Sequence, residues 1–157
     1  AVMAVVLTLL VVTVVLLIDL RNAVDTVLVL TPLLTAIIWV TGFMYILDFK
    51  VNIYNIVAFP TIIGMGIDNA VHVFHRYREA GPGSLRLVLH TTGVALVATT
   101  LTTMVGFAGL VPADHPALYW IGTVTLIGLG CCFITSVTLL PALLQLRERF
   151  SGQQALS

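Results

Sequence analysis

The sequence predicts an all-α, polytopic membrane protein with five transmembrane helices, and three observations lead to this fold class. First, 59% of the 157 residues are hydrophobic and 9% are charged, whereas a soluble domain carries about 25% charged residues. Second, the apolar residues form five runs, each close to the roughly 20 residues that a helix needs to cross a bilayer. Third, the arginines lie beside alternate turns between these runs. We therefore expect residues 1–157 to form a single transmembrane domain.

The spans can be placed from the charges and turn residues that separate them. The first is free of charge and ends before a polar turn, and the second ends before an Asp-Phe-Lys turn. The third contains Pro60 and ends at a polar loop centred on Gly-Pro-Gly, and a turn bounded by two prolines separates the fourth from the fifth. None of the runs shows the two-residue alternation of a barrel strand. In chain order we expect the spans at about 1–18, 26–47, 51–75, 87–111 and 117–146.

Basic residues divide unequally between the two ends of the expected bundle. Five alternating spans place six arginines at one end and Lys50 alone at the other. The six are Arg21, Arg76, Arg78, Arg86, Arg147 and Arg149. Because cytoplasmic loops carry an excess of lysine and arginine, we expect the arginine-rich loops on the cytoplasmic side.

Asp68 is the residue on which the functional prediction depends. It lies in the third apolar run, with no charged residue between it and Lys50 on one side or Arg76 on the other. Its separation from Arg76 corresponds to about 12 Å of helix, which places it close to mid-membrane. An ionised carboxylate at this depth costs roughly 3 kcal/mol or more, so such a residue is by default a functional candidate. We expect Asp68 to carry protons, because an acid that is neutral when dry and ionised when wetted suits that task. The alternative is a carboxyl held permanently by hydrogen bonds to neighbouring helices.

Residues close to Asp68 on the third span complete the expected site. His72 lies one helical turn toward the arginine-rich end and could pass protons to or from the acid. Asn69 could form hydrogen bonds across a helix interface. We group Asp68, Asn69 and His72 as a proton relay, with purely structural roles for Asn69 and His72 as the alternative. Gly64 and Gly66 are expected to let another helix approach closely just above the acid.

The fourth span carries a stripe of small and hydroxyl residues. Thr99 lies about half a bilayer from Arg86, near the depth of Asp68. We expect Thr99 and Thr103 to line the polar surroundings of Asp68, which requires the third and fourth helices to pack together. Plain helix packing by small residues is the alternative.

Metal binding and enzymatic activity find little support in the sequence. Asp68, His72 and His75 lie on one helix, where three metal ligands would splay apart. An aspartyl protease needs two carboxyls that share a proton, but every aspartate other than Asp68 falls in a predicted turn. The adjacent Cys131 and Cys132 are expected to be inert packing thiols. We expect no enzymatic activity and no cofactor, with protons as the coupling ion.

Three motifs resemble the RND (resistance-nodulation-division) superfamily, and most closely its MmpL-like and hopanoid-transporter branch. Gly-Met-Gly-Ile-Asp-Asn-Ala-Val-His at residues 64–72, followed by His-Arg-Tyr-Arg-Glu at residues 75–79, resembles a motif on the fourth helix of each half in that branch. Residues 99–107 resemble its next helix, and residues 138–143 resemble the end of its last. In that family each half has one helix, a large periplasmic domain and five further helices. The resemblance implies that this chain is the last five helices of a half, and we lean to the C-terminal half, with the periplasmic domain outside the chain.

The function that the resemblance implies is proton-driven export of lipids or other hydrophobic molecules. Asp68 matches the proton-carrying aspartate of the family, and Asn69 stands where a tyrosine or a second aspartate is common. Implied partners are the other half of the same transporter, a hydrophobic or lipid substrate and membrane lipids, with a homo-oligomer as a further possibility. The implied location is the bacterial inner membrane. A formal net charge of +0 argues against a nucleic-acid partner. Because Ala1 begins inside an apolar run, we expect a piece of a longer protein.

A second function remains open at this point. A sterol-sensing-like membrane module would share the five-helix architecture and bind lipid without pumping. The two functions differ in Asp68, which must take up and release protons only in the transporter.

Overall fold

A computed structural model describes residues 2–49 and 53–154, which form five helices without a strand. The helices are α1 (Val2–Leu20), α2 (Ala23–Ile46), α3 (Ile53–Ala80), α4 (Leu85–Ala108) and α5 (Pro116–Gln154). Each is long and apolar enough to cross a membrane. The predicted all-α class and the number of spans are therefore confirmed. Lys50, the basic residue expected opposite the arginines, lies outside the described residues.

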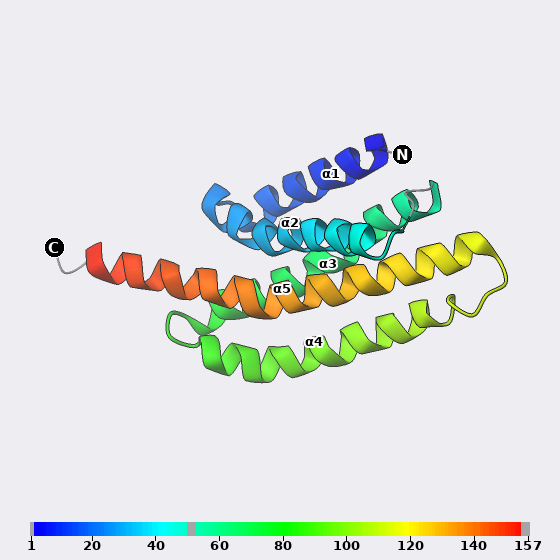
Figure 1. Cartoon of the computed structure of the whole chain (residues 1–157). Coiled ribbons are helices and arrows are strands. Elements are labelled where there is room, and N and C mark those ends of the chain that lie inside the picture. The colour runs from blue at the N-terminus through cyan, green and yellow to red at the C-terminus, as the bar shows by residue number, and fades with distance from the viewer. Residues whose placement is uncertain (1, 50–52, 155–157) are drawn as a thin grey trace.

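The helices cross the bundle in alternating directions (Figure 1). The α1–α2 turn, the α3–α4 turn and the end of α5 lie together at one end, and the α4–α5 connection lies at the other (Figure 1). All six arginines are placed at the first end by these turns and helix termini, and we call it the arginine end. The grouping of arginines expected from the sequence is thus present in the fold.

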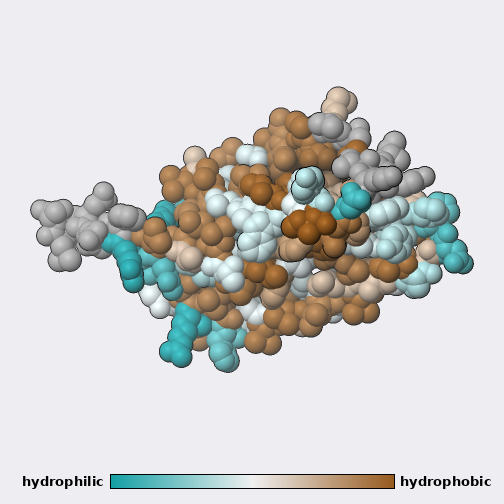
Figure 2. Space-filling view, viewed as in Figure 1, coloured by the Kyte–Doolittle hydropathy of each residue, from teal (hydrophilic) through white to brown (hydrophobic). Residues whose placement is uncertain are grey.

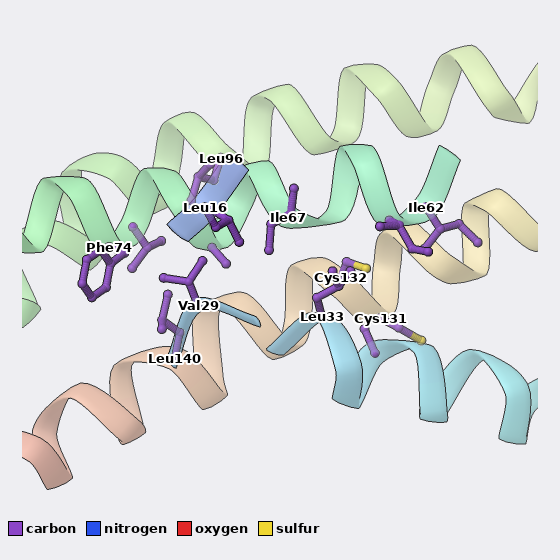
Figure 3. Close-up of a cluster of buried hydrophobic side chains, with 14 of the residues drawn as sticks. Leu16, Val29, Leu33, Ile62, Ile67, Phe74, Leu96, Cys131, Cys132 and Leu140 are labelled. Atoms are coloured by element: carbon purple, nitrogen blue, oxygen red, sulfur yellow. The ribbon is translucent and has the colours of Figure 1, made fainter. Parts of the chain in front are cut away.

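Helix α5 is the centre of the bundle. It packs against α2, α3 and α4, whereas α1 packs only against α2 and α3 among the described helices. Leu33 of α2, Ile62 of α3 and Cys132 and Leu140 of α5 belong to one buried cluster (Figure 3). Because α3 and α5 run in the same direction with a long shared interface, the position of α3 is set mainly by α5.

The outside of the bundle is apolar along most of its length. Figure 2 shows apolar residues over much of the middle of one face, with the most hydrophilic residues gathered toward its two ends. Exposed leucines, valines and isoleucines are numerous on α1, α2 and α4, which suits contact with acyl chains. Threonines on these helices are compatible with lipid because their hydroxyls donate to the carbonyl one turn earlier, as Thr31 does to Val27 (2.7 Å) and Thr102 to Ala98 (2.8 Å).

Two helices continue beyond the predicted spans at the arginine end. Helix α3 runs to Ala80 and α5 to Gln154, and both pass through a proline without interruption. The 39 residues of α5 extend about 58 Å, well beyond the roughly 30 Å of a bilayer core. The charged residues at these ends are good helix formers in water. The point where the sequence changes from apolar to charged therefore marks the membrane boundary, and the helix continues beyond it.

The α3–α4 turn depends on glycine. Gly81 and Gly83 both have φ of 83°, a left-handed conformation that side chains with a Cβ rarely adopt. The Gly81 N–H donates to the carbonyl of Tyr77 (2.9 Å) and ends α3. This turn brings α4 back beside α3 and so positions the candidate site between them.

Candidate functional site

A cleft of about 500 Å³ opens between α3 and α4, with Leu129 of α5 in its wall. Its polar lining consists of Asp68, Asn69 and His72 from α3 and Thr92, Thr99, Thr100 and Thr103 from α4. The structure thus brings together the three residues predicted as a proton relay and both predicted threonines. The expected pairing of α3 with α4 at the depth of Asp68 is present.

Helical spacing explains why these side chains meet. On α3, Asp68 and His72 are four residues apart and share a face. On α4, Thr92, Thr99 and Thr103 recur at steps of seven and four and form a matching stripe. The stretch of α4 from Thr92 to Thr103 covers about 16 Å along the helix axis, with Thr92 nearer the arginine end. Polar groups therefore extend from near the arginine end to the far side of mid-membrane.

The polar groups of the cleft differ in how their hydrogen bonds are satisfied. The hydroxyl of Thr99 donates to the carbonyl of Ala95 (3.2 Å), and that of Thr103 donates to Thr99 (2.9 Å). Asn69 is only 7% exposed and Thr100 only 8%, and the described residues provide no recorded partner for either side chain. Polar side chains that line an open cleft can bind water. The cleft therefore has the chemistry to hold water beside Asp68.

Asp68 itself is more open than the sequence led us to expect. Asp68, His72 and Gly64 are all exposed in the described bundle, and nothing lies within 4 Å of a Cβ built on Gly64. Asp68 thus faces α4 across the cleft without being covered by the described helices, and the close helix approach expected at Gly64 is wrong. The physical reason is that α4 crosses beside this face of α3 and leaves part of it uncovered.

Gly66 allows a close helix approach, but on a different face from the acid. A Cβ at Gly66 would collide with Sγ of Cys132 and lie 3.4 Å from Leu33. The close helix approach expected at Gly66 is therefore present, but on the opposite side of α3, because residues two positions apart in an α-helix point about 200° apart. Gly66 instead lets α5 and α2 pack against the back of α3. The free Cys132 is buried in that contact, as expected of a packing thiol.

A second polar cluster joins the helices at the arginine end. His75 of α3 pairs with Asp19 of α1 (Nε2 to Oδ2, 2.7 Å), and the hydroxyl of Tyr77 donates to Oε1 of Glu148 on α5 (2.6 Å). Arg147 of α5 pairs with Asp25 of α2, whose side chain is largely buried. None of these contacts was predicted from the sequence. Only their opposite charges at one end of the bundle indicated that they could pair.

The described residues contain no group of three or more histidine, cysteine, aspartate or glutamate side chains that could hold a metal ion. Asp68 also has no lysine, arginine or histidine partner in any recorded ion pair of these residues. No described cation therefore fixes the carboxylate of Asp68 in place.

Comparison with known proteins places the chain in a family. A model of the MMPL family matches residues 1–155. A putative membrane protein of Methanocaldococcus jannaschii is 36% identical over 142 residues, which are 87% of this chain and 37% of that protein. The hopanoid transporter HpnN of Burkholderia multivorans is 29% identical over 133 residues, 85% of this chain and 15% of the transporter.

A human relative shows how widely the similarity extends. Protein patched homolog 2 of Homo sapiens is 33% identical over 94 residues, 55% of this chain and 8% of that protein. No solved structure matches the chain. The chain spans 37% of the M. jannaschii protein and a smaller share of the other two. The match over residues 1–155 and the five helices agree with the resemblance seen in the motifs: the chain is a multi-pass membrane protein of the MMPL family.

Proposed function

We propose that this chain is the transmembrane part of a proton-motive-force-driven exporter of lipids or other hydrophobic molecules, with Asp68 as the proton carrier. The observation that carries the proposal is the cleft, in which a carboxylate near mid-membrane lies among polar side chains and has no cation partner among the described residues. Such a carboxylate can be hydrated and ionised in one conformation and dry and neutral in another. Each change of charge favours one conformation, and this coupling can drive transport.

His72 and the threonines have supporting roles in this proposal. His72 lies between Asp68 and the arginine end, so it can relay protons along the cleft. Asn69 and Thr100 hold the waters through which the protons move, and Thr99 and Thr103 line the path beyond Asp68. Gly64 leaves open space beside α3 one turn from Asp68, and Gly66 lets α3 pack closely against α5.

The open face beside Asp68 indicates which partners to expect. A carboxylate and an imidazole facing acyl chains would be costly, so another protein surface is expected to cover Gly64, Asp68 and His72. We propose the other half of the same transporter as this cover, with a second copy of the chain in a homo-oligomer as the alternative. Membrane lipids contact the remaining apolar surface. No cofactor, enzymatic activity or nucleic acid enters the proposal.

The substrate class rests on the relatives and on the membrane location. One relative is a hopanoid transporter, and a hydrophobic molecule can reach a five-helix bundle directly from the bilayer. The proposal is tested with the natural protein in inverted membrane vesicles, whose cytoplasmic face is outside, with a radiolabelled hopanoid or a fluorescent phospholipid supplied from the outside. We expect transport under an imposed pH gradient and its loss when a protonophore removes the gradient. Transport at the same rate without the gradient would contradict proton coupling.

A lipid-binding module without pumping is the second candidate, and the similarity to human patched homolog 2 is the observation that favours it. In this case the protein would bind lipid with an affinity that does not change with pH, and Asp68 would be a structural group. The vesicle experiment separates the candidates, because a module of this kind moves no substrate under either condition.

We also propose that the arginine end faces the cytoplasm of a bacterial inner membrane. The six arginines at this end support the orientation. Cysteines introduced at the exposed Pro82 and Asp114 test it with a membrane-impermeant thiol reagent. We expect Asp114→Cys to react in intact spheroplasts and Pro82→Cys to react only after lysis. The reverse pattern would show that the orientation is wrong.

A further inference from the structure

One oxygen atom of α5 binds two other elements at the arginine end. Oε1 of Glu148 accepts a hydrogen bond from the hydroxyl of Tyr77 on α3 (2.6 Å) and another from the backbone N–H of Gly83 in the α3–α4 turn (2.8 Å). Tyr77 lies in the last turn of α3 and Gly83 in the following turn, where the two walls of the Asp68 cleft diverge. Glu148 therefore fixes the base of the α3–α4 hairpin to the central helix.

The base of this hairpin matters because α4 is less buried than α3. Only 17% of its span is buried, compared with 44% for α3. One stripe of α4 is buried against the bundle, at Leu85, Val88, Gly93, Leu96 and Thr100. The residues beside this stripe, among them Thr92, Thr99 and Thr103, border the open cleft. A small rotation of the turn would thus change the distance between α4 and Asp68.

The surroundings of Glu148 leave room for such a rotation. A cavity of about 590 Å³ adjoins the contact and is lined by Phe74, Tyr77, Gly81 and Pro82 on one side and by Arg147 and Glu148 on the other. The neighbouring Arg147 is tied to Asp25 of α2, which is 7% exposed. Glu148 is therefore anchored through α5 and α2, while the turn that it holds has space to move.

We propose that Glu148 and Tyr77 are positioning residues that hold the cytoplasmic base of the α3–α4 hairpin closed and so set the width of the cleft around Asp68. When the two hydrogen bonds to Glu148 are broken, the turn moves into the adjoining cavity, α4 tilts away from α3, and water from the arginine end reaches Asp68 more readily. The consequence for proton access rests on the proposed function, whereas the effect on the cleft itself does not.

The width of the cleft can be measured without any transport. A reporter cysteine replaces Thr92, which lines the cleft on the arginine-end side, in the natural protein in lysed membranes. Its reaction with a membrane-impermeant maleimide is compared in four backgrounds: unaltered, Tyr77→Phe, Glu148→Ala and Glu148→Gln. We expect Tyr77→Phe and Glu148→Ala to raise the labelling rate about fivefold or more, since each removes at least one charge-assisted hydrogen bond. Glu148→Gln keeps an acceptor oxygen and should restore most of the protection.

The chain contains its own control for unfolding. Cys131 and Cys132 are buried between α5 and its neighbours, so they react only if the bundle opens as a whole. Glu79→Gln is the matched control variant, because Glu79 lies at the same end and its recorded ion pair among the described residues is with Arg76 of its own helix (3.0 Å). We expect Glu79→Gln to leave labelling at residue 92 unchanged.

Two results would overturn the proposal. The first is unchanged labelling at residue 92 in both Tyr77→Phe and Glu148→Ala while Cys131 and Cys132 stay protected. The second is equal exposure of residue 92 and of the two native cysteines in both variants, which would make the contact a general stabiliser of the fold. Neither result depends on whether Asp68 carries protons, so a failure here is distinguishable from a failure of the proposed function.

Discussion

Replacement of Asp68 by asparagine is expected to abolish proton-driven export while leaving the bundle folded and inserted. Asparagine is nearly isosteric with the protonated acid and stays neutral, so it holds the site in one charge state. A cycle that alternates between an ionised, hydrated site and a neutral, dry one then stops. Transport in inverted vesicles under a pH gradient should fall to the level of vesicles without the protein.

The stability of this variant should be close to that of the unaltered protein. Asp68 is exposed in the cleft and has no recorded hydrogen bond within the described residues, so the substitution is expected to change the free energy of unfolding by about 0.5 kcal/mol or less. Asp114→Asn, at an exposed position in the α4–α5 turn, is the matched control and should transport normally. His72→Ala should slow transport by about tenfold at most, because the open cleft admits water in place of the imidazole. Normal export by a well-inserted Asp68→Asn protein would make the carboxyl structural and favour the lipid-binding module.

The largest expected effect on stability comes from Gly128→Ala. A Cβ at this position would lie 2.6 Å from Cγ1 and 2.9 Å from Cγ2 of Ile62. Ile62 is fully buried between α3 and α5. Because both branches of its side chain would overlap with the new Cβ, a change of rotamer cannot relieve the overlap. Overpacking of this kind costs about 1–3 kcal/mol. Thermal unfolding in detergent, followed by the reaction of buried Cys131 and Cys132 with a fluorogenic maleimide, measures the loss.

A second substitution identifies the cause of that loss. Ile62→Ala removes the atoms that the new methyl group would meet, so the double variant should be more stable than the sum of the two single effects by about 1 kcal/mol or more. Gly106→Ala is the matched control, because nothing lies within 4 Å of a Cβ at Gly106. We expect it to be neutral or slightly stabilising, since alanine is the better helix former. Equal losses at Gly106 and Gly128 would show that the α3–α5 contact is not the cause.

The five helices could be predicted because hydropathy and span length act locally. Apolar runs that are each long enough to cross a bilayer are separated by turns, which contain Asn22, Gly81 and the two prolines between α4 and α5. The meeting of Asp68 with Thr99 and Thr103 could also be predicted, because distance along a helix from the arginine end gives depth. Depth and shared helical faces were enough to bring these residues together.

The rotation of α3 relative to its neighbours could not be predicted from depth alone. The sequence does not say which helix covers each face, and so the exposure of Asp68 and Gly64 was missed. The location of Gly66 against Cys132 could have been found, because its direction from Asp68 follows from the helical period. The contact between Tyr77 and Glu148 joins residues far apart in the chain, and only the folded bundle shows that they share one end.

The central claim is that Asp68 takes up and releases a proton as substrate moves, and proton flux tests it most directly. The natural protein is reconstituted into liposomes that contain a pH-sensitive dye, and a hopanoid is added with no pH gradient imposed. We predict proton movement across the membrane that depends on the hopanoid in the unaltered protein and in Asp114→Asn, and none in Asp68→Asn. Hopanoid-dependent proton movement of equal size in a folded Asp68→Asn protein would contradict the account.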